Sequence, residues 1–149
     1  PIRARVLYMD GGDITEGFTM QYTWYVPHDV QGYINLAGKK LFQKRLDELF
    51  TVELPEDIPG AHDIQGRIGG YWHGNEPCHH VAYLYNYLGQ PWKCQYWVRE
   101  ITSRFYGNEP GSLSGNDDCG QMSAWYVLAA SGIHPPVREI HVWRLQVRF

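Results

Sequence analysis

Residues 91–105 read PWKCQYWVREITSRF, and this stretch decides the fold class of the chain. Its apolar residues recur at the three- and four-residue spacing of one helix face, namely Cys94, Val98, Ile101 and Phe105. Pro91 suits the first helical turn because its missing N–H needs no partner there, and Gly107 follows the last turn. The stretch therefore predicts an amphipathic helix.

Four further helices are predicted on the two sides of this one from the same apolar spacing. They cover residues 27–37, 42–50, 75–88 and 116–129. Three of them begin with residue types that start helices, and a glycine closes most of them. Together these segments predict an all-α fold.

The stretches between the helices alternate between short turns, such as Gly89–Gln90, and long loops rich in Gly and Pro. The long loops cover residues 51–74 and 107–115. This order predicts stacked helical hairpins whose long loops gather at one end, where a functional site can form. Polar and apolar side chains alternate over residues 144–149, which predicts a short strand with no evident partner upstream.

The composition excludes several classes of protein. The 149 residues are 44% hydrophobic and 19% charged with a net charge of −3, unlike a disordered chain or a basic nucleic-acid binder, so we expect no nucleic-acid partner. No apolar run approaches the roughly 20 residues that span a bilayer. Cys78, Cys94 and Cys119 make no disulfide framework, although one pair and a free thiol fit the count.

The first candidate site is the segment Gly74–His80, which reads GNEPCHH. Glu76 falls in the predicted first turn of a helix, where free N–H groups favour a carboxylate, so capping is the simpler interpretation and catalysis the alternative. The two adjacent histidines would also suit zinc together with His73 or Cys78. The spacings His-Glu-x-x-His and Cys-x-x-Cys are both absent, which argues against zinc.

The second candidate site is the segment Ser114–Gln121, which reads SGNDDCGQ. Asn116, Asp117 and Asp118 stand at the start of a predicted helix. Adjacent carboxylates can bind a cation, or can transfer a proton because like charges raise one pKa. A helix N-cap is the alternative interpretation. The Asp-x-Asp-x-Asp-Gly pattern of an EF-hand is absent.

Glu16 marks a third candidate site. An isolated Glu before a Gly is usually an exposed loop residue, but Gln21, Trp24 and His28 follow it closely. Carboxylates supply an acid and a base for glycoside cleavage, amides and histidines bind hydroxyls, and aromatic rings stack on pyranose faces. This combination of residue types predicts a sugar site.

Four stretches carry a resemblance to a known family: TWYVPHDVQG (23–32), GNEPCHHVAYLYNY (74–87), GQPWK (89–93) and LSGNDDCGQMSAWYV (113–127). In this order they resemble glycoside hydrolase family 92, a family of calcium-dependent exo-acting α-mannosidases. The resemblance runs from about residue 16 to about residue 135 and implies an (α/α)6 barrel. It also implies that residues 1–149 are a fragment of one catalytic domain with an atypical tail at 136–149. The N-terminal β-sandwich and the remaining barrel helices of the family are then missing from this chain.

The resemblance implies roles for individual residues. Family members invert the anomeric centre, with a Glu acid that protonates the leaving oxygen and an Asp base that activates water. Glu16 resembles the acid, with Glu76 as the alternative, because either could stand the roughly 6.5–9.5 Å from the base that an inverting pair needs. Asp118 resembles the base, supported by Asp117 or Asn116. The residues that resemble substrate-binding ones are Glu76, His79, His80, Gln21 and Trp24, and those that resemble calcium ligands are Glu76 and Asn116.

The implied activity is the release of α-1,2-linked mannose from mannan or N-glycan mannosides, with Ca²⁺ as the cofactor. The implied location of the parent enzyme is the periplasm, the cell surface or the exterior. Two alternatives of other classes stay open: a mannose-binding module that does not hydrolyse its ligand, and an inert fragment.

Overall fold

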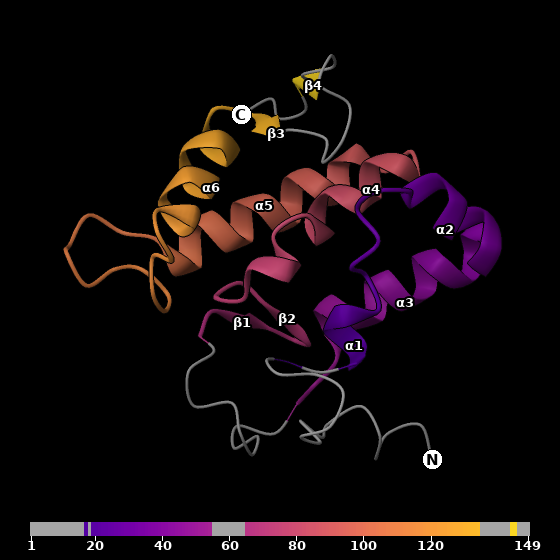
Figure 1. Ribbon diagram of the computed structural model, residues 1–149, viewed down its shortest axis with the longest axis horizontal. Helices are drawn as coiled ribbons and strands as arrows, with labels where there is room; N and C mark the ends of the chain where they lie inside the picture. The colour runs from indigo at the N-terminus through magenta and orange to yellow at the C-terminus, as the bar shows by residue number, and fades with distance from the viewer. Residues whose placement is uncertain (1–16, 18, 55–64, 135–143, 146–149) are drawn as a thin grey trace.

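The computed structural model describes residues 17, 19–54, 65–134 and 144–145, which are mostly helical (Figure 1). The longer helices in these ranges are α2 (Val30–Ala37), α3 (Lys39–Thr51), α5 (Pro91–Phe105) and α6 (Gln121–Ala130). The short helical segments are α1 (Thr19–Tyr22), α4 (Leu84–Tyr87) and the 3-10 turns η2 (Glu76–Cys78) and η3 (Val81–Tyr83). Antiparallel pairing joins β1 (Arg67–Ile68) to β2 (Tyr71–Trp72) and β3 (Ile133–His134) to β4 (Arg144–Leu145). The expected all-α class is confirmed.

The local sequence explains where the helices begin. The Asp29 carboxylate accepts a hydrogen bond from the Gly32 N–H at 2.8 Å and caps α2, which therefore begins at Val30, within the predicted range 27–37. Pro91 lies in the first turn of α5. That helix buries one face, which carries Cys94, Val98 and Ile101. None of the described helices is both long and apolar enough to cross a membrane.

Neighbouring helices pack as hairpins. α2 packs on α3, α4 on α5, and α5 on α6. Figure 1 shows α5 running between the α2–α3 pair and α6. The described ends of the two long loops meet, because the Gly115 N–H donates to Gln65 Oε1 at 3.3 Å. The predicted architecture of helical hairpins is therefore confirmed.

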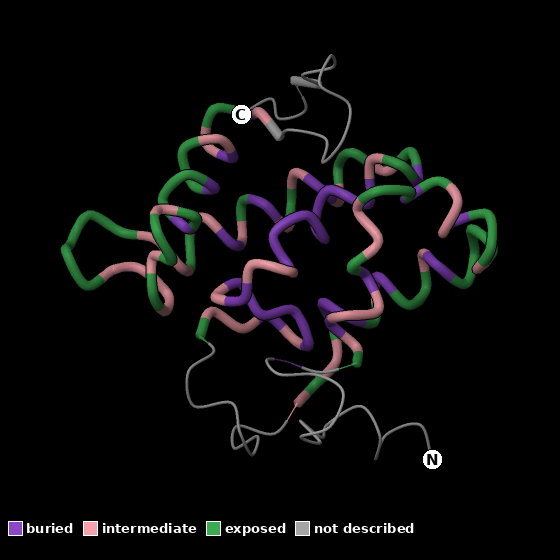
Figure 2. The backbone as a smooth tube through the Cα atoms, viewed as in Figure 1, coloured by how far each residue is buried: buried purple, intermediate pink, exposed green. Residues whose placement is uncertain are grey.

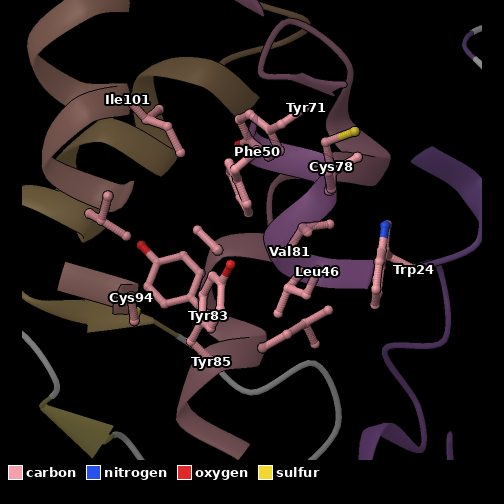
Figure 3. Close-up of a cluster of buried hydrophobic side chains, with 14 of the residues drawn as sticks. Trp24, Leu46, Phe50, Tyr71, Cys78, Val81, Tyr83, Tyr85, Cys94 and Ile101 are labelled. Carbon is pink, nitrogen blue, oxygen red and sulfur yellow. The ribbon is translucent and has the colours of Figure 1, made fainter. Parts of the chain in front are cut away.

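Phe50, near the C-terminal end of α3, lies in the centre of the core. Its ring stacks on Tyr71 of β2 and on Trp97 of α5, at centroid distances of 5.0 and 4.5 Å. Figure 3 shows Phe50 and Tyr71 among side chains that also come from η3 and α5, such as Val81 and Ile101. The exposed residues lie on the outer sides of the helices and along the loop that follows α5 (Figure 2).

Asp47 ties three helices together at the edge of this core. Its carboxylate on α3 accepts hydrogen bonds from the Tyr85 hydroxyl on α4 at 2.8 Å and from Lys93 Nζ on α5 at 2.6 Å. The Lys93 and Asp47 side chains are 31% and 37% exposed, so solvent screens the ion pair and we expect it to stabilise the fold by only about 1 kcal/mol. Its main effect is to fix how the three helices lie relative to one another.

The helix predicted at residues 75–88 is not continuous. It consists of η2, η3 and α4, because the N–H groups of Cys78, His79 and Tyr83 bond to carbonyls three residues earlier. The rings of His79 and His80 are also hydrogen-bonded to carbonyls outside this segment. These side-chain contacts hold the segment in short turns, a tertiary effect that the apolar spacing does not reveal.

The loop predicted at residues 51–74 contains a short hairpin. Ile68 and Tyr71 pair across the two-residue turn Gly69–Gly70. Gly69 has a φ of +58°, and a Cβ there would stand 2.7 Å from the Leu49 carbonyl oxygen, so the turn requires glycine. The Gly70 N–H donates to the same carbonyl at 2.7 Å. The turn is therefore docked on the end of α3.

Two smaller expectations are corrected. The C-terminal strand has an upstream partner, because Arg144–Leu145 pairs with Ile133–His134 directly after α6; residues 146–149 lie outside the described residues. The alternative of one disulfide is wrong, because Cys78 and Cys94 are buried free thiols and Cys119 is an exposed one.

Leu46→Ala should lower the free energy of unfolding by about 2–5 kcal/mol, because the truncation leaves a cavity at a core position that is 0% exposed. Urea unfolding followed by circular dichroism measures this loss. Leu41→Ala is the matched control, since Leu41 lies on the same helix but is 48% exposed. The control should change the free energy by less than about 0.5 kcal/mol, and equal losses in the two variants would contradict the core described here.

Candidate active site

The segments Gly74–His80 and Ser114–Gln121 lie against each other. A Cβ added at Gly74 would stand 3.3 Å from the Ser114 carbonyl oxygen. A Cβ at Gly66, the described end of the other long loop, would stand 3.0 Å from Ser114 Cβ. Because neither glycine carries a side chain, the three backbones can approach closely. The first two predicted sites are therefore one site.

Gly17, which follows Glu16 of the third predicted site, lies beside the Gly74–His80 segment. This residue has a φ of +96°, and a Cβ on it would lie 3.1 Å from Asn75 Nδ2. Gln21, which was predicted to bind substrate, packs beside Gly17 and is only 1% exposed. Glu16, the predicted acid, lies outside the described residues. The residue that follows it nevertheless contacts the Gly74–His80 segment.

Asp118, Cys119 and Gly120 form a left-handed turn before α6, with φ values of +48°, +55° and +91°. Residues with positive φ cannot continue a right-handed helix, so α6 begins at Gln121 and not at residue 116 as predicted. Aspartate tolerates this backbone conformation better than most residues do. The turn holds Asp118 at the surface, where it is exposed.

The two adjacent carboxylates have different environments. Asp117 Oδ1 accepts a hydrogen bond from the Ser123 N–H at 2.9 Å, and Oδ2 accepts one from the Ser123 hydroxyl at 3.0 Å. Asp117 thus satisfies a free N–H of the first turn of α6 from a position three residues before the N-cap, which is Gly120 and not a residue of the Asn116–Asp118 group. Its oxygens are engaged within the protein, which does not support a second catalytic carboxylate. Asp118 is the exposed member of the pair.

His73 is the centre of a buried chain of hydrogen bonds beneath the site. Its Nδ1 lies 2.8 Å from the Tyr71 hydroxyl, and its Nε2 lies 2.6 Å from the Tyr106 hydroxyl, which donates to the Met122 carbonyl at 3.1 Å. Every atom is satisfied when Tyr71 donates to Nδ1 and the Nε2–H donates to Tyr106. The ring is then neutral, and burial lowers the pKa of His73 from 6.5 to about 2. Because Tyr106 and Met122 flank the loop 107–121, this chain closes the loop at its base.

His79 lies between that buried chain and the surface. Its Nε2–H donates to the His73 carbonyl at 2.9 Å, and its Nδ1 lies 3.1 Å from Gln121 Nε2. Burial lowers the pKa of His79 below 6.5, although the His73 carbonyl and Asp118 act in the opposite direction. Both ring nitrogens have protein partners. This does not support the predicted direct contact of His79 with sugar, and the ring instead positions Gln121.

His80 and Trp24, both predicted to bind sugar, have structural positions. The His80 Nε2–H donates to the Trp24 carbonyl at 2.8 Å, and burial lowers the pKa of His80. Trp24 is 3% exposed, and its ring packs edge-to-face on Phe42 at a centroid distance of 5.1 Å. A ring enclosed in the core has no free face for a pyranose, so the position of Trp24 does not support stacking on sugar.

The histidines do not form a zinc site. No group of three or more His, Cys, Asp and Glu side chains in the described ranges could hold a metal ion. Cys78 is buried, which raises the pKa of its thiol to about 12 and disfavours the thiolate that zinc binds. The described residues therefore give no support to the zinc alternative.

The two predicted calcium ligands, Glu76 and Asn116, come from segments that touch. A Cβ at Gly115 would stand 4.0 Å from Gly74 Cα. Asn116 is exposed and Glu76 is partly exposed. Carboxylate and amide oxygens suit calcium, which takes six to eight oxygen ligands. The donor types therefore fit calcium, but these two residues supply at most part of a ligand set.

The geometry defines a class of protein. An exposed carboxylate on a fixed turn lies beside a segment with a second, partly exposed carboxylate, and the loops around them carry hydrogen-bonding groups. Two carboxylates placed on either side of a glycosidic bond are the usual apparatus of glycoside hydrolases. Comparison with known proteins identifies the family.

The sequence profile described as "Glycosyl hydrolase family 92 catalytic domain" matches residues 3–145, so the chain belongs to this family of glycosidases. The family GH92 α-mannosidase BT3965 from Bacteroides thetaiotaomicron, solved in complex with mannoimidazole, is 70% identical with a TM-score of 0.88, over 94% of this chain and 19% of that chain. A second structure of BT3965 is 71% identical with a TM-score of 0.83, over 94% of this chain and 18% of that chain. An "Uncharacterized secreted glycosidase" of Arthroderma benhamiae is 32% identical over 114 residues, which are 75% of this chain and 13% of that protein. The chain thus spans less than a fifth of the length of these relatives.

The chain should lose stability as the pH falls from 7.5 to 5.5. Burial lowers the pKa values of His73, His79 and His80 in the folded chain, whereas the unfolded chain binds protons on them near pH 6.5. The free energy of unfolding should therefore be highest above pH 6.5 and should fall below it, because only the unfolded chain then binds protons on these rings. The loss is about 1.4 kcal/mol per pH unit for each ring that stays neutral in the folded chain. Urea midpoints at the two pH values measure the loss. His28→Gln, at an exposed position, should show the same trend, and equal midpoints would contradict neutral buried rings.

Asp117→Ala should lower the free energy of unfolding by about 0.5–2 kcal/mol, because it removes the cap on α6. Asp118→Asn is the matched variant, since asparagine also tolerates a positive φ, and it should change the free energy by less than about 0.5 kcal/mol. Thermal unfolding of the two variants compares the neighbouring carboxylates directly. The assignment of the cap would be wrong if Asp118→Asn were the more destabilising change.

Proposed function

We propose that this chain supplies the general base and part of the sugar site of an inverting exo-α-mannosidase. The observation that supports this most is the meeting of three segments, at Gly17, Gly74–His80 and Ser114–Gln121, in a chain of glycosyl hydrolase family 92. A solved relative, 70% identical, is an α-mannosidase in complex with mannoimidazole, which favours a mannoside as the substrate.

Asp118 is the proposed general base. Its carboxylate is exposed, and the turn that carries it is fixed by the capping contacts of Asp117. In this role Asp118 takes a proton from the water that attacks the anomeric carbon. Glu16 is the proposed acid that protonates the leaving oxygen, with the two carboxyl groups roughly 6.5–9.5 Å apart. The contact of Gly17 with Asn75 supports this choice, because it brings the chain next to Glu16 to the same site.

Glu76 and Asn116 are the proposed contribution of this chain to a calcium site. A calcium ion held there would contact the mannose hydroxyls and favour distortion of the ring. The two residues hold the ion through oxygen atoms, and the other ligands come from outside this chain. If Glu76 does not hold the ion, its carboxylate is free to accept hydrogen bonds from sugar hydroxyls.

The finer features of the enzyme are also proposals. We propose that it releases α-1,2-linked mannose from mannan or N-glycans outside the cytoplasm, which agrees with a relative described as a secreted glycosidase. We further propose that the chain works within a complete catalytic domain, together with the β-sandwich and the other barrel helices of the family. The small share of each relative that it covers supports this.

A chimaera in which residues 3–145 replace the matching segment of BT3965 should hydrolyse an α-1,2-linked mannose disaccharide. In this chimaera Asp118→Asn should lower kcat by about 10²–10⁴-fold, the usual contribution of a general base, and Glu16→Gln should cause a loss of similar size. Asp29→Asn, which keeps a capping side chain on α2, is the control and should retain full kcat. Mannose release followed over time gives these rates.

Full kcat after Asp118→Asn would show that another residue is the base. A chimaera that binds mannose but releases none from the disaccharide would favour the alternative of a mannose-binding module. A chimaera that does neither would favour an inert segment.

The calcium proposal predicts that the chimaera melts at a higher temperature with calcium than with a chelator. Binding to the folded state alone stabilises by about 2.7 kcal/mol when the ion is present at 100 times its Kd. Glu76→Gln should reduce this gain, whereas Glu53→Gln, at an exposed position after α3, should not. Calorimetry measures the difference, and an unchanged gain in Glu76→Gln would exclude Glu76 as a ligand.

A further inference from the structure

Gln121 joins a buried histidine to the exposed surface of the site. It is the first residue of α6 and is exposed. Its Nε2 lies 3.1 Å from Nδ1 of His79, which is 5% exposed. Its backbone N–H donates to the Asp118 carbonyl at 3.1 Å. The Gln121 side chain therefore starts beside the proposed base and ends on the buried ring.

The hydrogen bonds of His79 fix which way the Gln121 amide faces. A carbonyl oxygen only accepts, so the ring nitrogen at the His73 carbonyl, Nε2, carries the hydrogen. In a neutral ring Nδ1 then has a lone pair and needs a donor. The NH₂ group of Gln121 is the donor that meets it. The amide oxygen must therefore point away from His79.

This orientation leaves an acceptor on Gln121, whose backbone N–H bonds to the Asp118 carbonyl. The His79 ring is near enough to Asp118 for the carboxylate charge to act on it, and Gln121 is bonded to the same ring. Both Asp118 and Gln121 are exposed. The surface here offers a carboxylate and an amide oxygen, which both accept hydrogen bonds, and the hydroxyls of a pyranose are donors.

We propose that Gln121 is a substrate-binding residue, whose Oε1 accepts a hydrogen bond from one hydroxyl of the mannose in the site and whose orientation is set by His79. This inference rests on the proposed function, because it takes mannose as the sugar. It also gives His79 a function as a positioning residue, in place of the direct sugar contact that the sequence suggested.

Isothermal titration of the BT3965 chimaera with mannose and with 2-, 3-, 4- and 6-deoxymannose tests this proposal. Gln121→Met keeps the length of the side chain but removes the acceptor, and it should weaken mannose binding about tenfold, the effect of one hydrogen bond. One deoxy sugar, which lacks the contacted hydroxyl, should bind the unmodified chimaera about tenfold more weakly than mannose does. That sugar should lose no further affinity in Gln121→Met, because its contact is already absent.

Gln31→Met is the matched control, since Gln31 is an exposed glutamine on α2 whose amide bonds only to Asn35 among the contacts described. It should bind all five sugars as the unmodified chimaera does. The proposal is overturned if Gln121→Met binds mannose with unchanged affinity. It is also overturned if Gln121→Met weakens mannose and every deoxy sugar by the same factor, because that pattern indicates a structural effect of the substitution.

The same titrations separate this inference from the proposed function. Mannose affinity that depends on Gln121, without hydrolysis of the disaccharide, would support the inference and contradict the enzyme. If Asp118→Asn abolished hydrolysis but Gln121→Met left the affinity for mannose unchanged, the enzyme would be supported and the inference contradicted. If the unmodified chimaera neither bound mannose nor hydrolysed the disaccharide, both would be contradicted.

Discussion

The hydrogen bond from the His79 ring to the His73 carbonyl is the contact on which the site depends. It joins the segment after β2 to the turns that carry Glu76, and it forces the Nε2–H form of a neutral ring. His73 in turn bonds to Tyr106, which closes the base of the loop that leads to Asp118. A proton added to either ring would go on Nδ1, which already faces a donor, the Tyr71 hydroxyl at His73 and the Gln121 NH₂ group at His79. The proposed site therefore rests on two imidazoles for which burial favours the neutral form.

The site also depends on the close approach of backbone segments at three glycines. Gly66, Gly74 and Gly115 lie where two loops and the Gly74–His80 segment meet, and side chains at the first two would collide with Ser114 or Gln65. The left-handed turn at Asp118–Gly120 is a local departure from regular structure in the same region. Such departures tend to occur at functional sites, where the surrounding structure holds them in place. Tyr71, which stacks on Phe50 in the core, connects to this region through its hydrogen bond to His73.

The sequence predicted the parts of the fold that depend on local spacing. The stripe of Cys94, Val98 and Ile101 was confirmed, because a periodic apolar face acts within one helix. The turns at residues 76–87 were mistaken for one helix, since the histidine rings there bond to carbonyls outside the segment, that of His73 just before it and that of Trp24 far along the chain. The Gly69–Gly70 hairpin could have been found, because two glycines between β-forming residues, here Ile68 and Tyr71, are a hairpin signal. The sequence pointed to Asp118, whose role stays a prediction, whereas Tyr106 and Gln121 could not be predicted because they owe their positions to tertiary contacts with two histidines.

His73 and His79 stay neutral and carry their hydrogens on Nε2, and their hydrogen bonds hold the segments of the site together. Long-range ¹H–¹⁵N correlation spectra of the imidazole rings in this chain, recorded from pH 7.5 to 5.5, test that claim residue by residue. We predict that both rings keep the Nε2–H form and neutral ¹⁵N shifts over the whole range. A ring that titrates with a pKa near 6.5, or that carries its hydrogen on Nδ1, would contradict the account.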